Sequence, residues 1–335
     1  MSKRMLFILL STLMVLALVM AACSGDEETE SEDISGQTVN ILTAAGEDQI
    51  AAFEASLAPF EERTGVDVVV EGSGDFETLA VVRAEADDPP DIYNFPQPGL
   101  MADFARDDFL IDLGQFLEDD YMKEQYNQTW IDLGTVDGTL YGVWHNADVK
   151  SLVWYPKDDF EAAGYEIPET WDELVALTDQ IVADGHTPWC IAIESSGATG
   201  WVGTDWVEDI MLRTAGGEKY DEWVAGDLPF DSPEVREAFR VMEEIWLNPD
   251  YVLGGTTGIL TTAFGDGPLP LFDEPPSCFL HRQASFILNF FPEGSVIGED
   301  VDYFYLPPID EANHGKPVLG SGSILSLGKD TPAGR

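Results

Sequence analysis

Basic residues are scarce in this sequence: 16 lysines and arginines stand against 63 aspartates and glutamates, a formal charge of −47 over 335 residues. Proteins bind nucleic acid largely through Lys and Arg side chains that neutralise phosphates. This composition therefore excludes a nucleic-acid partner, and it argues against anionic membrane surfaces and anionic substrates.

Histidine is also scarce, and the motifs of several enzyme classes are absent. The four histidines have no zinc-ligand spacing, and the sequence has no Gly-x-Ser-x-Gly elbow, phosphate-binding Gly-rich loop or EF-hand loop. These absences favour a binding protein over an enzyme, with neither a metal nor a cofactor. A secreted glycosidase that uses Asp148 and Asp205 stays open as an alternative because acids are abundant, although the chain lacks a (β/α)₈ pattern.

The composition is otherwise that of a folded protein. With 44% hydrophobic and 11% aromatic residues, the chain differs from an acidic disordered tail. Its length exceeds what one hydrophobic core usually organises, which predicts two lobes. The acids are spread along the sequence and belong on the surface. They suggest a secreted protein from a salty medium, where screening relieves self-repulsion, or alternatively an ordinary acidic exported protein.

The N-terminus has the pattern of an export signal. Lys3 and Arg4 precede an apolar run from Met5 to Ala22, and Cys23 follows. Small residues before Cys23 resemble the bacterial lipoprotein box, in which the cysteine becomes the lipidated N-terminus. We therefore expect residues 1–23 to be a signal peptide with its lipidation site, and residues 24–37 to be a flexible acidic tether. A retained anchor helix is the alternative.

Residues 38–93 predict the start of an α/β lobe. Residues 38–42 alternate like a strand, apolar residues from Ile50 to Phe60 recur at helical spacing until Gly65, and Val66 begins the next strand. This is a βαβ unit and predicts a parallel sheet. Pro59 predicts a kink or break in the helix. Another strand at 91–93 follows. The loops after the first and third strands are candidate site walls, because ligands bind at the carboxyl ends of such strands.

Helix starts are recognisable further along the chain. Thr170 to Glu173 form a capping box, and Ser232 followed by Pro233 opens a second helix. Thr331 with Pro332 predicts a third start, but the chain stops at Arg335, so we expect a C-terminally truncated sequence.

Three segments resemble a known signature: residues 137–143, residues 152–164 and residues 168–174. They are similar to the sugar-binding lipoproteins of ABC importers, the extracellular solute-binding family that includes maltose-binding protein. The resemblance extends over residues 1–330 and includes motifs of the branch that binds α-glucosides, at residues 190–195, 200–206, 216–223 and 273–286. It implies a two-lobed, periplasmic-binding-protein-like (type II) α/β fold with a hinge.

Residues 189–206 have the composition of a sugar-binding segment, independently of the resemblance to any family. Three tryptophans and Asp205 fall in a stretch rich in Gly, Ser and Thr. Aromatic faces cover the apolar side of a pyranose, and carboxylates accept hydrogen bonds from its hydroxyls. We assign Trp189 to the core, and Trp201 and Trp206 to the site. The resemblance adds sugar contacts, so that the predicted binding residues are Glu47, Asp48, Phe95, Gln97, His145, Asp148, Trp201, Asp205, Trp206, Phe272 and Phe279.

The sequence has three cysteines. With Cys23 assigned to the lipid, Cys190 and Cys278 remain, and two cysteines in an exported protein predict one disulfide. Two buried free thiols are the alternative.

Together these features predict a lipid-anchored, extracytoplasmic monomer that captures an α-glucoside such as maltose or trehalose for a membrane permease. We expect lobe 1 at 38–145, lobe 2 at 146–317, and a return into lobe 1 at 318–335. The chain crosses between the lobes near 144–149 and 316–322. A binding protein for another polyol or amino sugar is the alternative.

Overall fold

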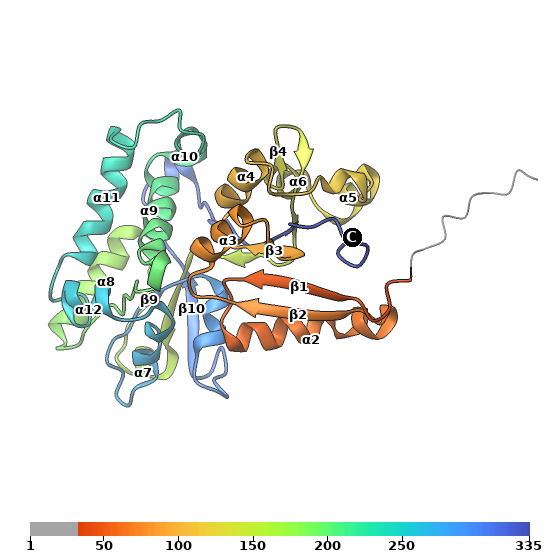
Figure 1. The fold of residues 1–335 in the computed structure, drawn as a ribbon. Coiled ribbons are helices and arrows are strands. Elements are labelled where there is room, and N and C mark those ends of the chain that lie inside the picture. The colour runs from red at the N-terminus through yellow and green to blue at the C-terminus, as the bar shows by residue number, and fades with distance from the viewer. Residues whose placement is uncertain (1–32) are drawn as a thin grey trace, which may run out of the picture.

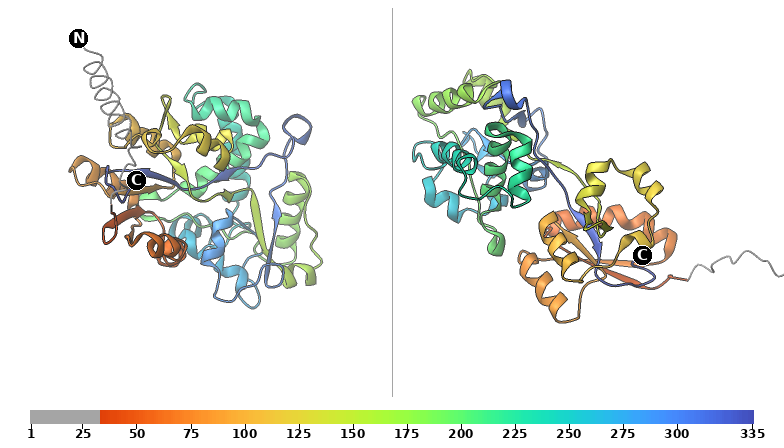
Figure 2. Two further views of the ribbon diagram at one scale, coloured as in Figure 1. Left: turned by 90° about the vertical axis from the view of Figure 1, so that its right-hand side faces the viewer. Right: turned by 90° about the horizontal axis from the view of Figure 1, so that it is seen from above.

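The structure is a computed structural model that describes residues 33–335. Two α/β lobes lie side by side and are joined by a narrow connection (Figures 1 and 2). The predicted signal peptide, Cys23 and most of the predicted tether lie outside the described residues. No helix among the described residues is long and apolar enough to cross a membrane.

Lobe 1 is built on a five-stranded sheet with the strand order β2-β1-β3-β12-β6. Strand β1 pairs in parallel with β2 and β3, as the βαβ pattern predicts. The late strand β12 inserts antiparallel between β3 and β6, so the sheet is mixed. These strands are β1 (Thr38–Thr43), β2 (Asp67–Gly72), β3 (Ile92–Phe95), β6 (Val143–Trp144) and β12 (Ile324–Leu327). A small hairpin joins β4 (Thr135–Val136) to β5 (Thr139–Leu140).

Helix α2 (Glu47–Thr64) covers one face of this sheet, where Ile50, Phe53, Leu57 and Phe60 pack on a buried cluster that contains Val39 and Ile41. The helix ends before Gly65, whose φ of 72° is left-handed and suits glycine. The predicted break at Pro59 is wrong, because α2 continues through it. Proline removes one backbone donor there, and the packed apolar stripe holds the helix together around the gap.

The other face of the sheet carries a second cluster that includes Phe76, Tyr93, Phe95, Phe104 and Trp144. The remaining helices of lobe 1 are α3 (Phe76–Glu85), α4 (Pro98–Arg106), the 3-10 turn η1 (Leu113–Gln115), α5 (Asp119–Gln125) and α6 (Gln128–Leu133).

Lobe 2 has an antiparallel three-stranded sheet in the order β10-β8-β9. Its strands are β8 (Leu152–Pro156), β9 (His281–Arg282) and β10 (Val301–Tyr305). Its helices and 3-10 turns are α7 (Lys157–Ala162), α8 (Trp171–Ala183), η2 (Ser196–Ala198), α9 (Trp201–Thr214), α10 (Gly216–Val224), α11 (Pro233–Trp246), α12 (Gly255–Thr261), η3 (Phe264–Asp266), η4 (Leu269–Phe272), η5 (Ser285–Phe290) and α13 (Glu311–His314).

The predicted helix starts of lobe 2 are confirmed. The Thr170 hydroxyl accepts from the Glu173 backbone N–H at 3.3 Å, and the Glu173 carboxylate accepts from the Thr170 N–H at 3.1 Å. The Ser232 hydroxyl accepts from the Val235 N–H at 3.3 Å. Residues 332–334, after Thr331, form a turn.

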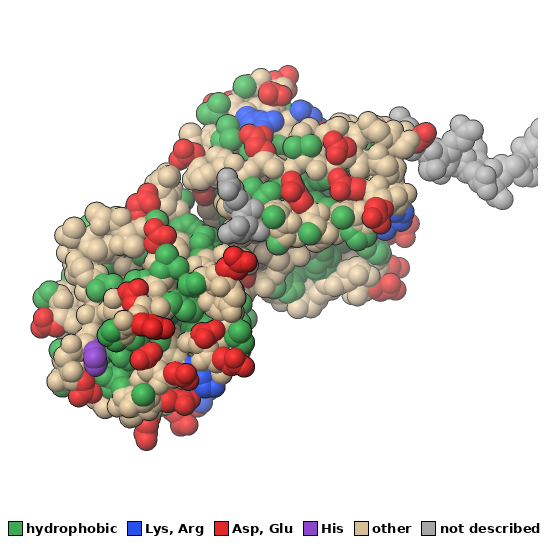
Figure 3. Space-filling view, turned by 90° about the horizontal axis from the view of Figure 1, so that it is seen from below, with side chains coloured by type: hydrophobic (Ala, Val, Ile, Leu, Met, Phe, Trp, Pro, Cys, Tyr) green, Lys and Arg blue, Asp and Glu red, His purple; other side chains and the backbone are tan. Residues whose placement is uncertain are grey.

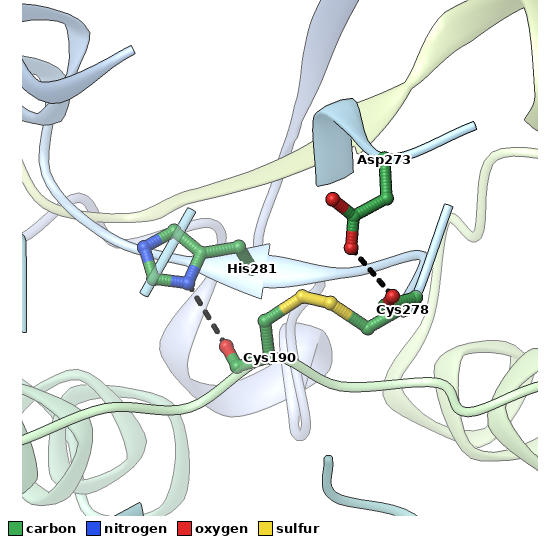
Figure 4. Close-up of a disulfide and its surroundings, with 5 residues drawn as sticks. Cys190, Asp273, Cys278 and His281 are labelled. Atoms are coloured by element: carbon green, nitrogen blue, oxygen red, sulfur yellow. Dashed lines mark hydrogen bonds between the residues drawn. A yellow bond between two sulfur atoms is a disulfide. The ribbon is translucent and has the colours of Figure 1, made fainter. Parts of the chain in front are cut away.

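A disulfide joins Cys190 to Cys278, as predicted, across 88 residues and with Cα atoms 5.7 Å apart (Figure 4). Both cysteines are buried. His281 lies beside the bridge, and its Nδ1 is 2.9 Å from the carbonyl oxygen of Cys190 (Figure 4). The bridge therefore ties the segment after Trp189 to the loop before β9.

Two short strands connect the lobes. Strand β7 (Asp148–Val149) in the first crossing pairs antiparallel with β11 (Gly320–Ser321) in the second. The crossings thus form a two-stranded ribbon, which we call the crossing ribbon. After it, β12 returns to the sheet of lobe 1.

Candidate functional site

Four half-buried aromatic side chains gather on lobe 2. Trp201, the first residue of α9, contacts Phe264 of η3 with ring centroids 5.2 Å apart and Phe286 of η5 at 5.8 Å. Phe290 lies 5.1 Å from Phe264. None of the four side chains is fully buried. We call this group the aromatic platform, and it offers the apolar faces that a pyranose ring requires.

The platform lies on the side of lobe 2 that faces lobe 1. Gly200 has a left-handed φ of 110°, so the chain turns sharply into α9 there. Just before it, η2 contacts α3 of lobe 1. A Cβ placed on Gly197 in η2 would lie 3.4 Å from an Asp75 carboxylate oxygen, which shows how closely the lobes approach. Trp201 therefore stands beside a point where the two lobes meet.

Asp205 follows Trp201 by one helical turn and supplies the polar group nearest to the platform along α9. Its Oδ1 accepts from the Lys150 ammonium at 2.6 Å. Its Oδ2 is buried and has no hydrogen-bond partner among the described residues. A buried carboxylate oxygen without a partner costs free energy, so a hydrogen bond from a water molecule or a ligand hydroxyl would stabilise it.

Asp148 connects the platform to the crossing ribbon. Its Oδ1 accepts from the Ser285 hydroxyl at 2.9 Å, and the same hydroxyl oxygen accepts from the Val149 N–H at 3.2 Å. Ser285 directly precedes Phe286 of the platform. The ribbon and the platform thus meet at one serine.

Glu208 extends the polar surface one turn beyond Asp205. Burial raises the pKa of the Glu208 carboxyl above its ordinary value, and the nearby Lys150 partly counteracts this. The Tyr220 hydroxyl donates to Glu208 at 3.3 Å. Lys150 therefore pairs with Asp205 and, together with Arg282, favours the charged form of Glu208.

Lobe 1 contributes residues at the ends of its strands and in the first crossing. Gln97, at the start of α4, donates from Nε2 to the Glu77 carboxylate at 2.7 Å. His145 stacks on Phe53 of α2, with ring centroids 4.8 Å apart. Desolvation lowers the pKa of His145, while the Asp148 carboxylate acts in the opposite direction. Glu47 and Asp48 begin α2, but their side chains lie outside what the structure describes.

Three predicted contacts disagree with the structure, because their side chains lie in the cores of the lobes. Phe95 is 0% exposed in lobe 1, and Trp206 and Phe279 are 1% and 3% exposed in lobe 2. Trp206 packs between Trp189 and Trp246, and Phe279 packs against Tyr165. We therefore assign all three to the cores. Trp189 is also core, as predicted.

Phe272 and Phe279, both predicted as binding residues, lie outside the aromatic platform. Phe272 contacts Phe291, with ring centroids 5.1 Å apart, in the cluster around the disulfide. Phe264, Phe286 and Phe290 take part instead, and sequence reasoning missed them together with Lys150. Phe286 lies in a segment that resembles the sugar-binding branch, and Lys150 follows Asp148 by two residues. The sequence therefore contained a weak indication that both residues belong to the candidate site.

No metal centre accompanies this site in the part of the chain that the structure describes. Among residues 33–335, no three His, Cys, Asp or Glu side chains are grouped so that they could hold a metal ion. The groups around the platform are aromatic rings, hydroxyls and charge-compensated carboxylates, which suit a polar organic ligand.

Two α/β lobes, joined by a ribbon and facing each other across such a surface, define a two-lobed solute-binding protein. The chain belongs to the family of bacterial extracellular solute-binding proteins, whose pattern matches residues 44–333. The members of this family are binding proteins and not enzymes, so the glycosidase alternative is set aside.

Two curated relatives are identical to this chain at almost half of the aligned positions. It is 48% identical to the osmoprotective compounds-binding protein GgtB of Synechocystis sp., over 99% of this chain and 78% of that protein. It is 46% identical to the alpha-glucosides-binding periplasmic protein AglE of Rhizobium meliloti, over 92% of this chain and 69% of that protein.

Solved structures share the fold at lower identity. Maltose-bound MalE3 of T. maritima superposes with a TM-score of 0.68 at 20% identity, over 89% of this chain and 74% of that one. The apo form of RafE from Streptococcus pneumoniae gives a TM-score of 0.64 at 21% identity, over 89% of this chain and 74% of that one. These structures establish the architecture of the two lobes.

Proposed function

We propose that this protein captures an α-glucoside of the maltose or trehalose type outside the cytoplasm and delivers it to the membrane permease of an ABC importer. The observation that carries the proposal is the aromatic platform together with the unpartnered Oδ2 of Asp205, one turn of α9 after Trp201. The rings cover the apolar face of a glucose unit, and the carboxylate oxygen accepts from one of its hydroxyls. A relative with 46% identity is named for binding α-glucosides.

The binding mechanism is lobe closure. Lobe 2 contributes Trp201, Asp205 and Asp148, and lobe 1 contributes His145 and Gln97. A ligand that contacts both lobes stabilises the closed form, which offers the permease one combined surface. Lobe 1 comprises 38–145, lobe 2 comprises 146–317, and 318–335 returns to lobe 1. Cys23 carries the lipid that holds the monomer at the membrane.

A small polyol or an amino sugar is the second candidate ligand. The relative with 48% identity is named for osmoprotective compounds, which makes a compatible polyol a reasonable occupant of the same surface. Rings and hydrogen-bond acceptors serve any compound that has one apolar face and several hydroxyls.

Titration of the mature protein, followed by tryptophan fluorescence in high salt, tests the proposal. Maltose, trehalose, sucrose and palatinose are compared with glycerol-based polyols and a sugar that lacks glucose. We expect a saturable change with one or two α-glucosides and no free glucose after long incubation. A response only to polyols would select the second candidate, and release of glucose would contradict a pure binding role.

A further inference from the structure

Hydrogen bonds and ion pairs attach almost every residue of the two crossings to one lobe or the other. The residue in each crossing where these contacts pass from one lobe to the other locates the bend between the lobes. The first crossing is held by lobe 1 up to Asn146. Trp144 pairs with Ile324 of β12, and the His145 N–H donates to the Ser323 carbonyl at 3.2 Å. The Asn146 side chain accepts from the Ser323 N–H at 2.6 Å.

From Asp148 onward, the first crossing is held by lobe 2 through three side-chain contacts within four residues. Asp148 binds Ser285, and Lys150 binds Asp205 of α9. The Ser151 hydroxyl donates to Oδ1 of Asp209 at 2.8 Å, where Asp209 is also paired with buried Arg213 and Arg282. Only Ala147 lies between the part held by lobe 1 and the part held by lobe 2.

The second crossing has the same division. The Tyr305 hydroxyl and Arg213 both donate to the Pro317 carbonyl, at 2.7 and 3.2 Å. The Leu319 N–H donates to the Ser151 hydroxyl at 2.9 Å. Strand β11 then pairs with β7, and Ser323 is already bonded to lobe 1. Only Gly322 lies between the two groups of contacts.

We propose that bending between the lobes is confined to Ala147 and Gly322, and that the crossing ribbon moves as part of lobe 2. Gly322 lies close to the part of the first crossing that lobe 1 holds, since a Cβ on Gly322 would lie 2.2 Å from the Asn146 carbonyl oxygen and 2.9 Å from the Trp144 ring. A cavity of about 330 Å³ beside Trp130, Trp144 and residues 145–147 gives the first crossing room to move.

This division gives His145 and Asp148 different roles in closure. His145 moves with lobe 1, where it stacks on Phe53, and Asp148 moves with lobe 2, where it binds Ser285. His145 and Asp148 are three positions apart, on either side of the bend at Ala147. A ligand that touches both residues therefore links the two lobes and opposes their separation. The proposal rests on the lobe closure of the proposed function, but its test needs no ligand.

The test measures distances between spin labels in the ligand-free protein by pulsed electron resonance. Labels are carried on p-acetylphenylalanine at Tyr121 of lobe 1, Tyr303 of lobe 2 and Val149 of the ribbon. All three side chains are exposed. In unmodified protein we expect a narrow distribution for the pair Val149 with Tyr303, and a broader one for the pair Val149 with Tyr121.

The variant Gly322→Ala and its control Gly320→Ala sharpen the test. The added Cβ at Gly322 forces the crossings apart, while at Gly320 the nearest atom is 3.8 Å away. We expect Gly322→Ala to shift the distances from Tyr121 to both other labels, with the distance from Val149 to Tyr303 unchanged. Gly320→Ala should shift none of them. A changed distance between Val149 and Tyr303, or equal effects of the two substitutions, would overturn the proposal.

If Gly322→Ala does not fold, Ala147→Gly replaces it. Glycine widens the backbone freedom at the bend, so the distribution between Val149 and Tyr121 should broaden while that between Val149 and Tyr303 keeps its width. Broadening of both distributions would place the bend inside the ribbon and overturn the proposal. These outcomes are independent of which solute the protein binds, so they separate this proposal from the proposed function.

Discussion

Trp201 and Trp206 lie five residues apart on α9 and face different surroundings. Trp201 is half-buried in the aromatic platform, whereas Trp206 is 1% exposed and packs between Trp189 and Trp246. Five residues at 3.6 per turn separate the two side chains by about 140° around the helix axis. One helix therefore supplies both a ring of the aromatic platform and a core ring.

Alanine substitutions should separate these two tryptophans. We expect Trp201→Ala to weaken solute binding about tenfold, because one stacking face is lost, with little change in stability. Trp206→Ala should lower the free energy of unfolding by about 3 to 5 kcal/mol. Urea unfolding and ligand titration of both variants check this. Unchanged affinity in Trp201→Ala would show that the platform is not the binding surface.

Asp209 should be among the most sensitive positions for stability. It is 0% exposed and pairs with two buried arginines, Arg213 and Arg282. Asp209→Asn leaves two buried cations without their anion, which costs about 3 to 5 kcal/mol. Asp231→Asn is the control, because its contact with Arg236 is 3.8 Å long and exposed to solvent, and should change stability by less than about 1 kcal/mol. Similar urea midpoints for both variants would contradict this.

His281 should make stability depend on pH. Burial lowers the pKa of His281 to about 4, below the value of about 6.5 in an unfolded chain. The unfolded chain therefore binds a proton first as pH falls. The contribution of neutral His281 to the free energy of unfolding is fully present above about pH 6.5. It is lost as the pH falls from there to about 4, and the loss is about 3 kcal/mol at most.

The variant His281→Asn isolates this contribution. The Asn amide can replace the Nδ1–H donor to the Cys190 carbonyl and does not titrate in this range. Urea unfolding at several pH values should give a smaller loss between pH 6.5 and 4 in the variant than in the unmodified protein. Equal losses would assign the acid sensitivity to other groups.

Salt should stabilise this protein. On the face shown in Figure 3, acidic side chains are spread over both lobes with few basic ones between them, in line with 63 acidic residues and 16 basic ones in the sequence. Raising NaCl from about 0.1 M to about 1 M shortens the screening length from about 10 Å to about 3 Å. We expect the melting temperature to rise by about 5 °C or more over this range.

The salt effect should disappear when the carboxylates are neutral. At about pH 3 most of them are protonated, so the melting temperature of any protein still folded should respond little to NaCl. A melting temperature at pH 7 that does not change with salt would contradict the role of surface repulsion.

Local sequence signals predicted much of the fold. The cap residues Thr170 and Ser232 and the stop at Gly65 act through bonds or dihedral angles within a few residues, so they can be recognised without tertiary structure. The disulfide followed from counting cysteines. Pro59 shows the limit, because tertiary packing holds a helix together through an unfavourable residue.

The site was predicted less well because it depends on side-chain direction. Phe95 was expected in the loop after a strand at 91–93, whereas β3 runs to Phe95 and the ring enters the buried cluster that contains Phe76 and Phe104. The platform joins η3 and η5 to the first turn of α9. Nothing within one segment shows that these three will meet.

Strand β12 has a consequence for the order in which the protein can be built during synthesis. It lies between β3 and β6, and β6 has no other neighbour in the sheet. The polypeptide emerges from the ribosome N-terminus first, so the edge of β3 waits for a partner until residues 324–327 have been made. Lobe 2 is by then complete in sequence from β8 to β10. Among the described strands, the sheet of lobe 1 therefore begins first and receives its last strand after the sheet of lobe 2, with an open strand edge in the interval.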